Sequence, residues 1–233
     1  MFFLAESKGW FNNSQAGFRK GMSCEDQILK ITQAIEDSFH QSPRKVAVLI
    51  FLDFSKAYDT VWRAKLLHSM LNTGVPLLYV KWVHSFLQNR QARVRYDGTL
   101  GISRQFHQGL PQGSVLSPLL FLFYINNLAN IIPNFNINAM FADDVSILAT
   151  ANTKEEAVRK AQAGVDVVVR WSKEWKLNLN TGKSESSFFS LAAHESNFSP
   201  QIVIDGVVIK SNKNPRLLGV HLDRQETLIQ QTC

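Results

Sequence analysis

Residues 139–148 have the sequence AMFADDVSIL, in which two adjacent acids, Asp143 and Asp144, interrupt an otherwise apolar segment. The pattern predicts a β-hairpin with Ala142 and the two acids at its tight turn. The runs on either side of the acids are apolar almost throughout, which is typical of strands that are buried on both faces. We therefore expect a buried hairpin with its two acids at the tip.

Two interpretations of this acid pair are open. Asp tolerates turn conformations, so an isolated Asp-Asp pair is usually an ordinary solvated hairpin tip. At a buried tip, however, two carboxylates repel each other and lose hydration, and a bound divalent cation is the usual remedy. Hard oxygen ligands with few protein groups suit Mg²⁺. The apolar flanks favour the metal site.

A third carboxylate follows a second apolar run. Val46 to Leu52 has strand length and β-branched content, which predicts a central buried strand that ends at Asp53. Asp53 then lies at the carboxyl end of a strand, where sheets of this kind commonly build sites. One acid there and two at a hairpin tip could hold two Mg²⁺ ions about 3.5–4 Å apart, the spacing that supports in-line phosphoryl transfer.

The composition indicates a globular protein with a basic balance. The chain has 233 residues, of which 45% are hydrophobic, and a formal net charge of +6. The charge favours a polyanionic partner, although many soluble proteins are basic as well. Cys24 and Cys233 have no spacing typical of zinc sites or disulfide frameworks, and no segment approaches transmembrane length. We expect an intracellular protein, in the nucleus or cytoplasm, that is not secreted and has no membrane partner.

Five segments resemble, in order and spacing, the motifs of reverse transcriptases from non-LTR retrotransposons, jockey-like elements in particular. They are residues 51–61 (FLDFSKAYDTV, motif A), 108–118 (QGLPQGSVLSP, motif B) and 141–144 (FADD, motif C), then Lys183 with its neighbours (motif D) and residues 217–222 (LLGVHL, motif E, the primer grip). The resemblance extends from about Ser14 to Asp223. A single acidic pair is weak evidence, but ordered motifs are a specific signal.

The resemblance implies an α+β right-hand polymerase palm, an antiparallel sheet backed by two long helices with the motif A strand beside the motif C hairpin. Strands and helices that interleave without a regular βαβ repeat agree with this class. Residues 1–45 and about 75–107 are expected to be fingers-related, and residues 46–74 and 108–222 to be palm. We expect residues 1–233 to be a partial domain that lacks the upstream fingers segment and the thumb.

The implied reaction is RNA-directed DNA synthesis, in which a dNTP adds to the 3′-hydroxyl of a DNA primer on an RNA template. Asp53 and Asp143 would hold two Mg²⁺ ions, with Asp144 assisting and the Phe54 carbonyl as a further ligand. Lys183 would protonate the leaving pyrophosphate, although a surface lysine near a turn explains it equally well. Other parts of the same element's polyprotein are possible partners.

The resemblance also assigns residues to the nucleotide. Tyr58 would contact the sugar, where a bulky ring excludes the 2′-hydroxyl that distinguishes RNA from DNA nucleotides. The alternative for Tyr58 is a half-buried structural side chain. Gln112 and Gly113 would shape the pocket of the nascent base pair, although a simple turn would also favour Gly113.

Nucleic-acid contacts are expected from Arg19, in a loop between two glycines, and from Leu218 and Gly219 in the primer grip. The alternative for Arg19 is a solvated surface turn.

A basic hairpin is predicted around Asp97-Gly98, a good two-residue turn. Arg93 and Arg95 alternate with apolar residues, so one face of this ribbon is positive. Those charges either contact nucleic acid or protect an exposed edge strand from aggregation. On the preceding helix, Trp82 and Phe86 are expected in the core rather than as base-stacking platforms.

Two other functions fit parts of the pattern. An RNA-dependent RNA polymerase shares the palm and the three acids, but the bulky Tyr58 argues against ribonucleotide use. A truncated, catalytically idle nucleic-acid-binding remnant of a mobile element is the stronger alternative. The three intact acids favour the enzyme.

Overall fold

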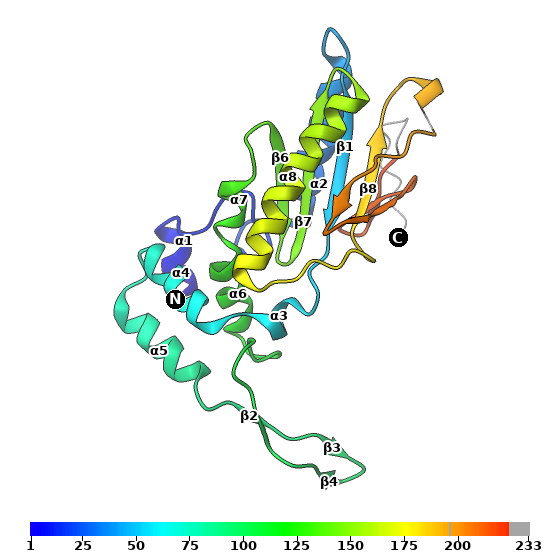
Figure 1. Cartoon of the computed structure of the whole chain (residues 1–233). Coiled ribbons are helices and arrows are strands. Elements are labelled where there is room, and N and C mark those ends of the chain that lie inside the picture. The colour runs from blue at the N-terminus through cyan, green and yellow to red at the C-terminus, as the bar shows by residue number, and fades with distance from the viewer. Residues whose placement is uncertain (196, 224–233) are drawn as a thin grey trace.

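The computed structural model describes residues 1–195 and 197–223, so Cys233 lies outside the described residues. A five-stranded sheet in the order β11-β8-β1-β7-β6 forms its centre (Figure 1). These strands are β1 Val46–Leu52, β6 Asn136–Phe141, β7 Asp144–Ala151, β8 Glu185–Phe189 and β11 Lys210–Ser211. Neighbours pair antiparallel except for β11 and β8. The expected antiparallel sheet, with the motif A strand beside the motif C hairpin, is confirmed.

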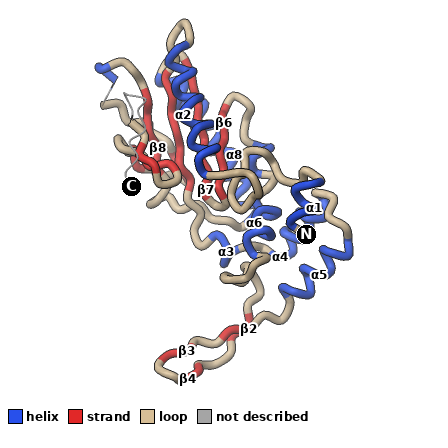
Figure 2. The backbone as a smooth tube through the Cα atoms, turned by 180° about the vertical axis from the view of Figure 1, so that it is seen from behind, coloured by secondary structure: helices blue, strands red, loops and turns tan. Residues whose placement is uncertain are grey.

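Helices cover both faces of this sheet. The described residues form the helices α1 Phe2–Ser7, α2 Cys24–His40, α3 Ala57–Thr60, α4 Arg63–Asn72, α5 Leu77–Leu87, α6 Ser117–Ile125, α7 Leu128–Ile131 and α8 Lys154–Trp175, of which α2 and α8 pack on the sheet. The long α8 lies in front of the sheet in Figure 1, and α2 lies in front of it when the molecule is seen from behind in Figure 2. The sheet is therefore the middle of three layers.

Strand β1 is central because its side chains are apolar on both faces. Val48 and Ile50 point to the layer of α8, while Ala47 and Leu49 belong to the cluster that α2 covers. All four side chains are fully buried. The alternation follows the two-residue period of a strand, and the predicted buried strand is confirmed.

Helix α2 packs on the sheet although its segment is expected to be fingers-related. A capping box between Ser23 and Asp26 begins the helix, and Ile28, Ile31 and Ile35 form its buried stripe. The division of the chain into fingers-related and palm segments stays a prediction.

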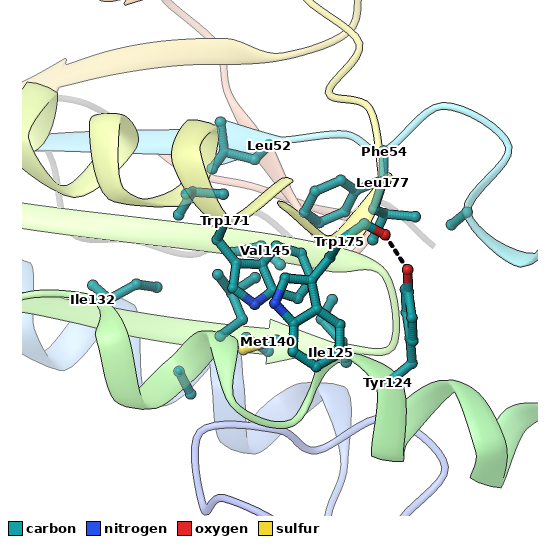
Figure 3. Packing of buried hydrophobic residues seen from close by; sticks show 14 of the residues in the cluster. Leu52, Phe54, Tyr124, Ile125, Ile132, Met140, Val145, Trp171, Trp175 and Leu177 are labelled. Atoms are coloured by element: carbon teal, nitrogen blue, oxygen red, sulfur yellow. Dashed lines mark hydrogen bonds between the residues drawn. The ribbon is translucent and has the colours of Figure 1, made fainter. Parts of the chain in front are cut away.

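The end of α8 is fixed to α6 by aromatic packing. Trp171 and Trp175 stack on each other at 5.2 Å, and Phe54 meets Trp171 edge-on at 6.2 Å. The Tyr124 hydroxyl donates to the Trp175 carbonyl (Figure 3). It also accepts from the Trp62 N–H at 3.2 Å. These contacts hold the chain after β1 against the helical layer.

Residues 88–108 form an arm that extends away from the body (Figures 1 and 2), and every one of them is exposed. Its short strands are β2 Gln91–Ala92, β3 Arg95–Tyr96, β4 Thr99–Leu100 and β5 Arg104–Gln105, with β3 paired to β4 and β2 to β5. Asp97 and Gly98 both have positive φ at the turn, as predicted.

Smaller elements complete the described residues. They are the 3₁₀ turn η1 Ala193–Glu195 and the strands β9 Val203–Ile204, β10 Val207–Val208, β12 Arg216–Leu217 and β13 Val220–His221. Among the described residues, no helix is both long enough and apolar enough to span a lipid bilayer.

Candidate functional site

The hairpin of β6 and β7 carries the acid pair at a two-residue turn. Phe141 pairs with Asp144, so Ala142 and Asp143 form the turn and Asp144 opens β7. Ala142 has a φ of 55°, a left-handed conformation that is uncommon for a residue with a side chain. The predicted hairpin is confirmed, with Asp144 one position beyond the turn, but the expected burial holds for the strands and not for the acids: Asp143 is half-buried and Asp144 is exposed.

The third acid lies beside this tip because β1 and β7 are neighbours. Leu52 pairs with Val145, so Asp53 follows directly at the end of β1 where Asp144 begins β7. Burial of the carboxyl group raises the pKa of Asp144, and the negative charges of Asp143 and Asp53 raise it further. Asp53 and the adjacent pair Asp143-Asp144, which lie far apart in sequence, thus share one electrostatic environment.

The donor chemistry of this environment fits a hard divalent cation. Carboxylates and backbone carbonyls are the ligands that Mg²⁺ takes in proteins. After β1 the chain pairs with residues 178–180: Asn180 N–H donates to the Asp53 carbonyl, and Ser55 N–H donates to the Asn178 carbonyl. This pairing does not use the Phe54 carbonyl. Among the described residues, however, no three His, Cys, Asp or Glu side chains are grouped closely enough to form a metal site.

Tyr58 lies on α3, within the electrostatic reach of Asp143. Its ring stacks on Phe121 with centroids 4.8 Å apart and an interplanar angle of 15°. Burial raises the pKa of Tyr58 to about 12, with a contribution from the charge of Asp143. The ring therefore packs on Phe121 of α6, while its hydroxyl interacts electrostatically with Asp143.

The motif B loop docks directly on α3. Leu110 N–H donates to the Tyr58 carbonyl and Gly109 N–H to the Val61 carbonyl, both at 2.8 Å. Gly109 has a φ of 78°, and a Cβ atom there would lie 2.5 Å from the Asp59 carbonyl oxygen, so only glycine fits.

The two predicted pocket residues of this loop follow at its exposed end. The Gln112 side chain donates to the Asp59 carboxylate at 2.8 Å. Gly113 has a φ of 80° and open space where a side chain would point. Both residues lie beside α3, the helix that carries Tyr58.

Two of the acids, Asp53 and Asp144, line a pocket of about 270 Å³. It brings together predicted residues from four motifs, namely Asp53, Asp144, Lys183, Leu218 and Gly219. Lys183 is exposed, and its neighbour Ser184 accepts the Asp53 N–H at 3.2 Å. Leu218 and Gly219 form the positive-φ turn between β12 and β13. The predicted motif D and motif E residues thus border the predicted catalytic acids.

The same pocket contains a residue that the sequence analysis missed. Gln27 on α2 is 4% exposed, and its Oε1 atom has no hydrogen-bond partner. It lies four residues before Ile31 on the buried stripe of the helix. A polar residue within that apolar stripe is the signal that could have revealed it.

Arg19 occupies a different environment from the expected surface loop. Its side chain is only 7% exposed, and its guanidinium binds both carboxylate oxygens of Glu6, at 2.9 and 3.1 Å. It also donates to the carbonyls of Asn12 and Gln15. All of these partners lie within the fold. The expected solvated turn is therefore wrong, and Arg19 forms a buried ion pair instead.

The arm places Arg93 and Arg95 away from the acids, on an exposed ribbon. Trp82 on the preceding helix is 52% exposed and stacks on Phe86 at 5.9 Å, so the expectation that Trp82 is a core residue is wrong. Arg90 lies over the other aromatic, with its guanidinium 5.4 Å from the centre of the Phe86 ring. Basic and aromatic side chains therefore share the exposed surface at the base of the arm.

Comparison with known proteins gives the same assignment as the motifs. Residues 5–222 match the family model described as reverse transcriptase (RNA-dependent DNA polymerase). The chain is 30% identical over 219 residues to the probable RNA-directed DNA polymerase from transposon BS, and 27% identical to the RNA-directed DNA polymerase from mobile element jockey, both of Drosophila melanogaster. The alignments cover 91% of this chain and 24% and 23% of those proteins, so the chain spans about a quarter of their length.

Solved structures show the same fold at low sequence identity. Apo telomerase from Candida tropicalis, truncated from its C-terminal domain, has a TM-score of 0.66 at 12% identity and covers 99% of this chain and 43% of that chain. Telomerase from the same organism in complex with a fragment of telomeric RNA has a TM-score of 0.66 at 13% identity, with coverage of 98% and 35%. Reverse transcriptases generally use divalent metal ions. The family match and the fold together show that this chain belongs to the reverse transcriptase family.

Proposed function

We propose that this chain contains the catalytic core of an RNA-directed DNA polymerase from a non-LTR retrotransposon. The observation that carries the proposal is the position of Asp53 beside the pair Asp143-Asp144 at one end of the sheet, with Lys183 in the pocket that Asp53 and Asp144 line and Tyr58 close enough for the charge of Asp143 to raise its pKa. Metal ligands, sugar contact and general acid are the parts that such a reaction requires.

Asp53, Asp143 and the Phe54 carbonyl would hold two Mg²⁺ ions, with Asp144 assisting. When bound, such ions activate the attacking hydroxyl and stabilise the leaving pyrophosphate. The mutual repulsion that raises the pKa of Asp144 supports this role, because a cation relieves it.

The remaining residues would orient the substrates. The Tyr58 ring, fixed on Phe121, would lie against the sugar of the incoming nucleotide and exclude a 2′-hydroxyl. Lys183, exposed at the rim of the pocket, would give its proton to the pyrophosphate oxygen. Leu218 and Gly219 would support the primer end, and Gln112 and Gly113 the templating base pair.

The arm would bind the RNA template or the template–primer duplex through Arg93 and Arg95. Phosphate contacts require exposed cations rather than a fixed pocket, and every residue of the arm is exposed. One structural neighbour is a telomerase in complex with a fragment of telomeric RNA, and this likeness supports the proposal that the present chain binds RNA. Other segments of the same polyprotein would complete the enzyme.

Primer extension on an RNA template tests the proposal directly. The chain, alone and as part of its full-length element, is supplied with dNTPs and Mg²⁺, with Asp143→Asn as the inactive control. Mg²⁺-dependent extension that Asp143→Asn abolishes is the expected result. RNA binding without extension in either form would instead identify an idle nucleic-acid-binding remnant.

A further inference from the structure

Gln15 makes an unusual set of contacts with the turn that carries the acids. It is 1% exposed and lies 127 residues before Ala142 in the chain. Its Nε2 donates to the Ala142 carbonyl at 3.0 Å, and its Oε1 accepts the Ala142 N–H at 2.8 Å. The side-chain amide thus pairs with both backbone groups of one residue, as a neighbouring strand would.

The turn needs such a partner. Ala142 is 5% exposed and has a φ of 55°, so its backbone groups are shielded from water in a conformation that the residue does not favour. Ala142 directly precedes Asp143. Gln15 therefore binds the backbone groups that directly precede Asp143 and set the direction of its side chain.

A second layer fixes Gln15 itself. Its Oε1 also accepts the Gly17 N–H at 2.8 Å, and its backbone carbonyl accepts from Arg19 at 3.1 Å. Arg19 is anchored in turn by the Glu6 carboxylate. The segment on either side pairs with the hairpin, because Met140 N–H donates to the Ser14 carbonyl at 2.8 Å and Ala16 N–H to the Met140 carbonyl at 2.9 Å.

Close packing leaves the turn little freedom to shift. A Cβ atom on Gly17 would lie 2.2 Å from the Ala142 nitrogen, so the two backbones touch where a side chain would clash. Together these contacts enclose the backbone of Ala142 at the hairpin tip.

We propose that Gln15 is a positioning residue, which fixes the Ala142 peptide and thereby the carboxylates of Asp143 and Asp144 in the arrangement that binds metal. The Arg19–Glu6 ion pair supports it from behind. The inference rests on the proposed function for its effect on synthesis, but its effect on the turn can be measured separately.

Gln15→Met keeps the length of the side chain and removes all three hydrogen bonds to backbone groups. Amide hydrogen exchange followed by NMR should show the Ala142 and Gly17 amides exchanging at least about tenfold faster, while Met140 keeps its protection through Ser14. Ser69→Ala, which removes a buried 2.7 Å bond to the Phe123 carbonyl far from the turn, is the matched control and should leave Ala142 unchanged. Unaltered Ala142 exchange in Gln15→Met would overturn the proposal.

Metal binding supplies the functional readout. Mn²⁺ affinity, measured by electron paramagnetic resonance without substrate, should fall about 10–100-fold in Gln15→Met, the range for residues that orient ligands. The Mg²⁺ concentration for half-maximal synthesis should rise by a similar factor, with primer–template affinity unchanged.

A second variant covers the case in which Gln15→Met does not fold. Gly17→Ala keeps Gln15 but pushes against the Ala142 nitrogen, so it should weaken Mn²⁺ binding as well. Normal Mn²⁺ affinity in the folded variants would reject the positioning role. A wild-type protein that binds Mn²⁺ but makes no DNA, both as the chain alone and within its full-length element, would reject the proposed function and leave the role of Gln15 intact.

Discussion

Two hairpins of this chain turn through two residues and differ in almost everything else. Ala142-Asp143 at the tip of β6 and β7 is held by Gln15, packed against Gly17 and flanked by a second acid. Asp97-Gly98 at the tip of the arm contacts no core cluster, and the residues around it are exposed, with Tyr96 at 83%. Turn chemistry alone therefore does not decide whether a hairpin becomes a rigid site or a free arm. Contacts from elsewhere in the chain do.

The contrast follows what each hairpin would have to do. Reaction at a metal centre needs its ligands fixed to fractions of an ångström, and buried hydrogen bonds provide that. Contact with a charged polymer needs accessible cations, and a two-stranded ribbon that buries little apolar surface provides those. Substitutions at the first hairpin should therefore change chemistry, and substitutions at the second should change binding.

The largest effect is expected from Asp53→Asn. Loss of one carboxylate beside the acid pair should lower synthesis at least about a thousandfold, because the group acts on the reacting atoms, while RNA affinity stays within a factor of two or so. Single-turnover primer extension and filter binding measure the two quantities. Asp205→Asn, at the turn between β9 and β10, is the control and should synthesise normally. Substantial synthesis by Asp53→Asn would remove the metal assignment.

The second-largest effect is expected on the choice between deoxynucleotides and ribonucleotides. Tyr58→Ala removes the ring that stacks on Phe121 and should raise ribonucleotide use relative to deoxynucleotide use by about 10–100-fold, since exclusion by a single bulky group is of this order. Competing single-nucleotide incorporations measure the ratio. Tyr96→Ala, the same substitution on the arm, should leave it unchanged. A constant ratio in Tyr58→Ala would leave this tyrosine with a structural role only.

Local signals in the sequence predicted the elements on which both hairpins rest. The apolar run before Asp53, the acids between two apolar strands and the Asp97-Gly98 turn each act through near neighbours, and all three are found as expected. The motif residues predicted for the catalytic site also lie around one pocket and one helix.

The supports of the site were not predictable from the same signals. The hydrogen bonds between Gln15 and Ala142 join residues 127 positions apart, and no periodicity or turn preference specifies such a pair. Arg19 lies between glycines, which is typical of a surface loop, yet Glu6 turns it into a buried ion pair. Trp82 is exposed because, among the described residues, no element covers its face of α5, and apolar character alone does not supply that element.

A smaller effect is expected on nucleic-acid binding. Arg93→Gln with Arg95→Gln should weaken RNA binding several-fold at physiological salt and reduce the slope of log affinity against log salt by about two, one for each lost phosphate contact. Fluorescence anisotropy across a salt series measures both quantities. Arg159→Gln with Lys173→Gln on α8 makes the same change in net charge and should leave the slope unaltered. Equal slopes in both double variants would mean that the arm contributes only net charge.

The smallest effect, on stability, compares the two turns most directly. Burial and the charges of Asp143 and Asp53 raise the pKa of Asp144, so the folded chain holds this proton more tightly than the unfolded chain does. Stability from this group is therefore present at low pH and is lost as the pH rises through the unfolded and then the folded pKa. Asp144→Asn should raise the melting temperature of the metal-free protein at pH 7 and have little effect at a pH well below 3.8, the ordinary pKa of this carboxyl, where it is protonated in both the folded and the unfolded chain.

Melting curves in a chelator at the two pH values measure this difference, and added Mg²⁺ should favour the wild-type chain and reduce it. Asp97→Asn is the matched substitution at the arm turn, where Asn tolerates the positive φ equally well. It should shift the melting temperature at neither pH, because Asp97 is exposed on the arm, away from the acids at the tip of β6 and β7. If Asp144→Asn and Asp97→Asn behaved alike, the tip of β6 and β7 would hold no more repulsion than an exposed turn, and the relief of that repulsion by a cation could no longer explain why three acids meet there.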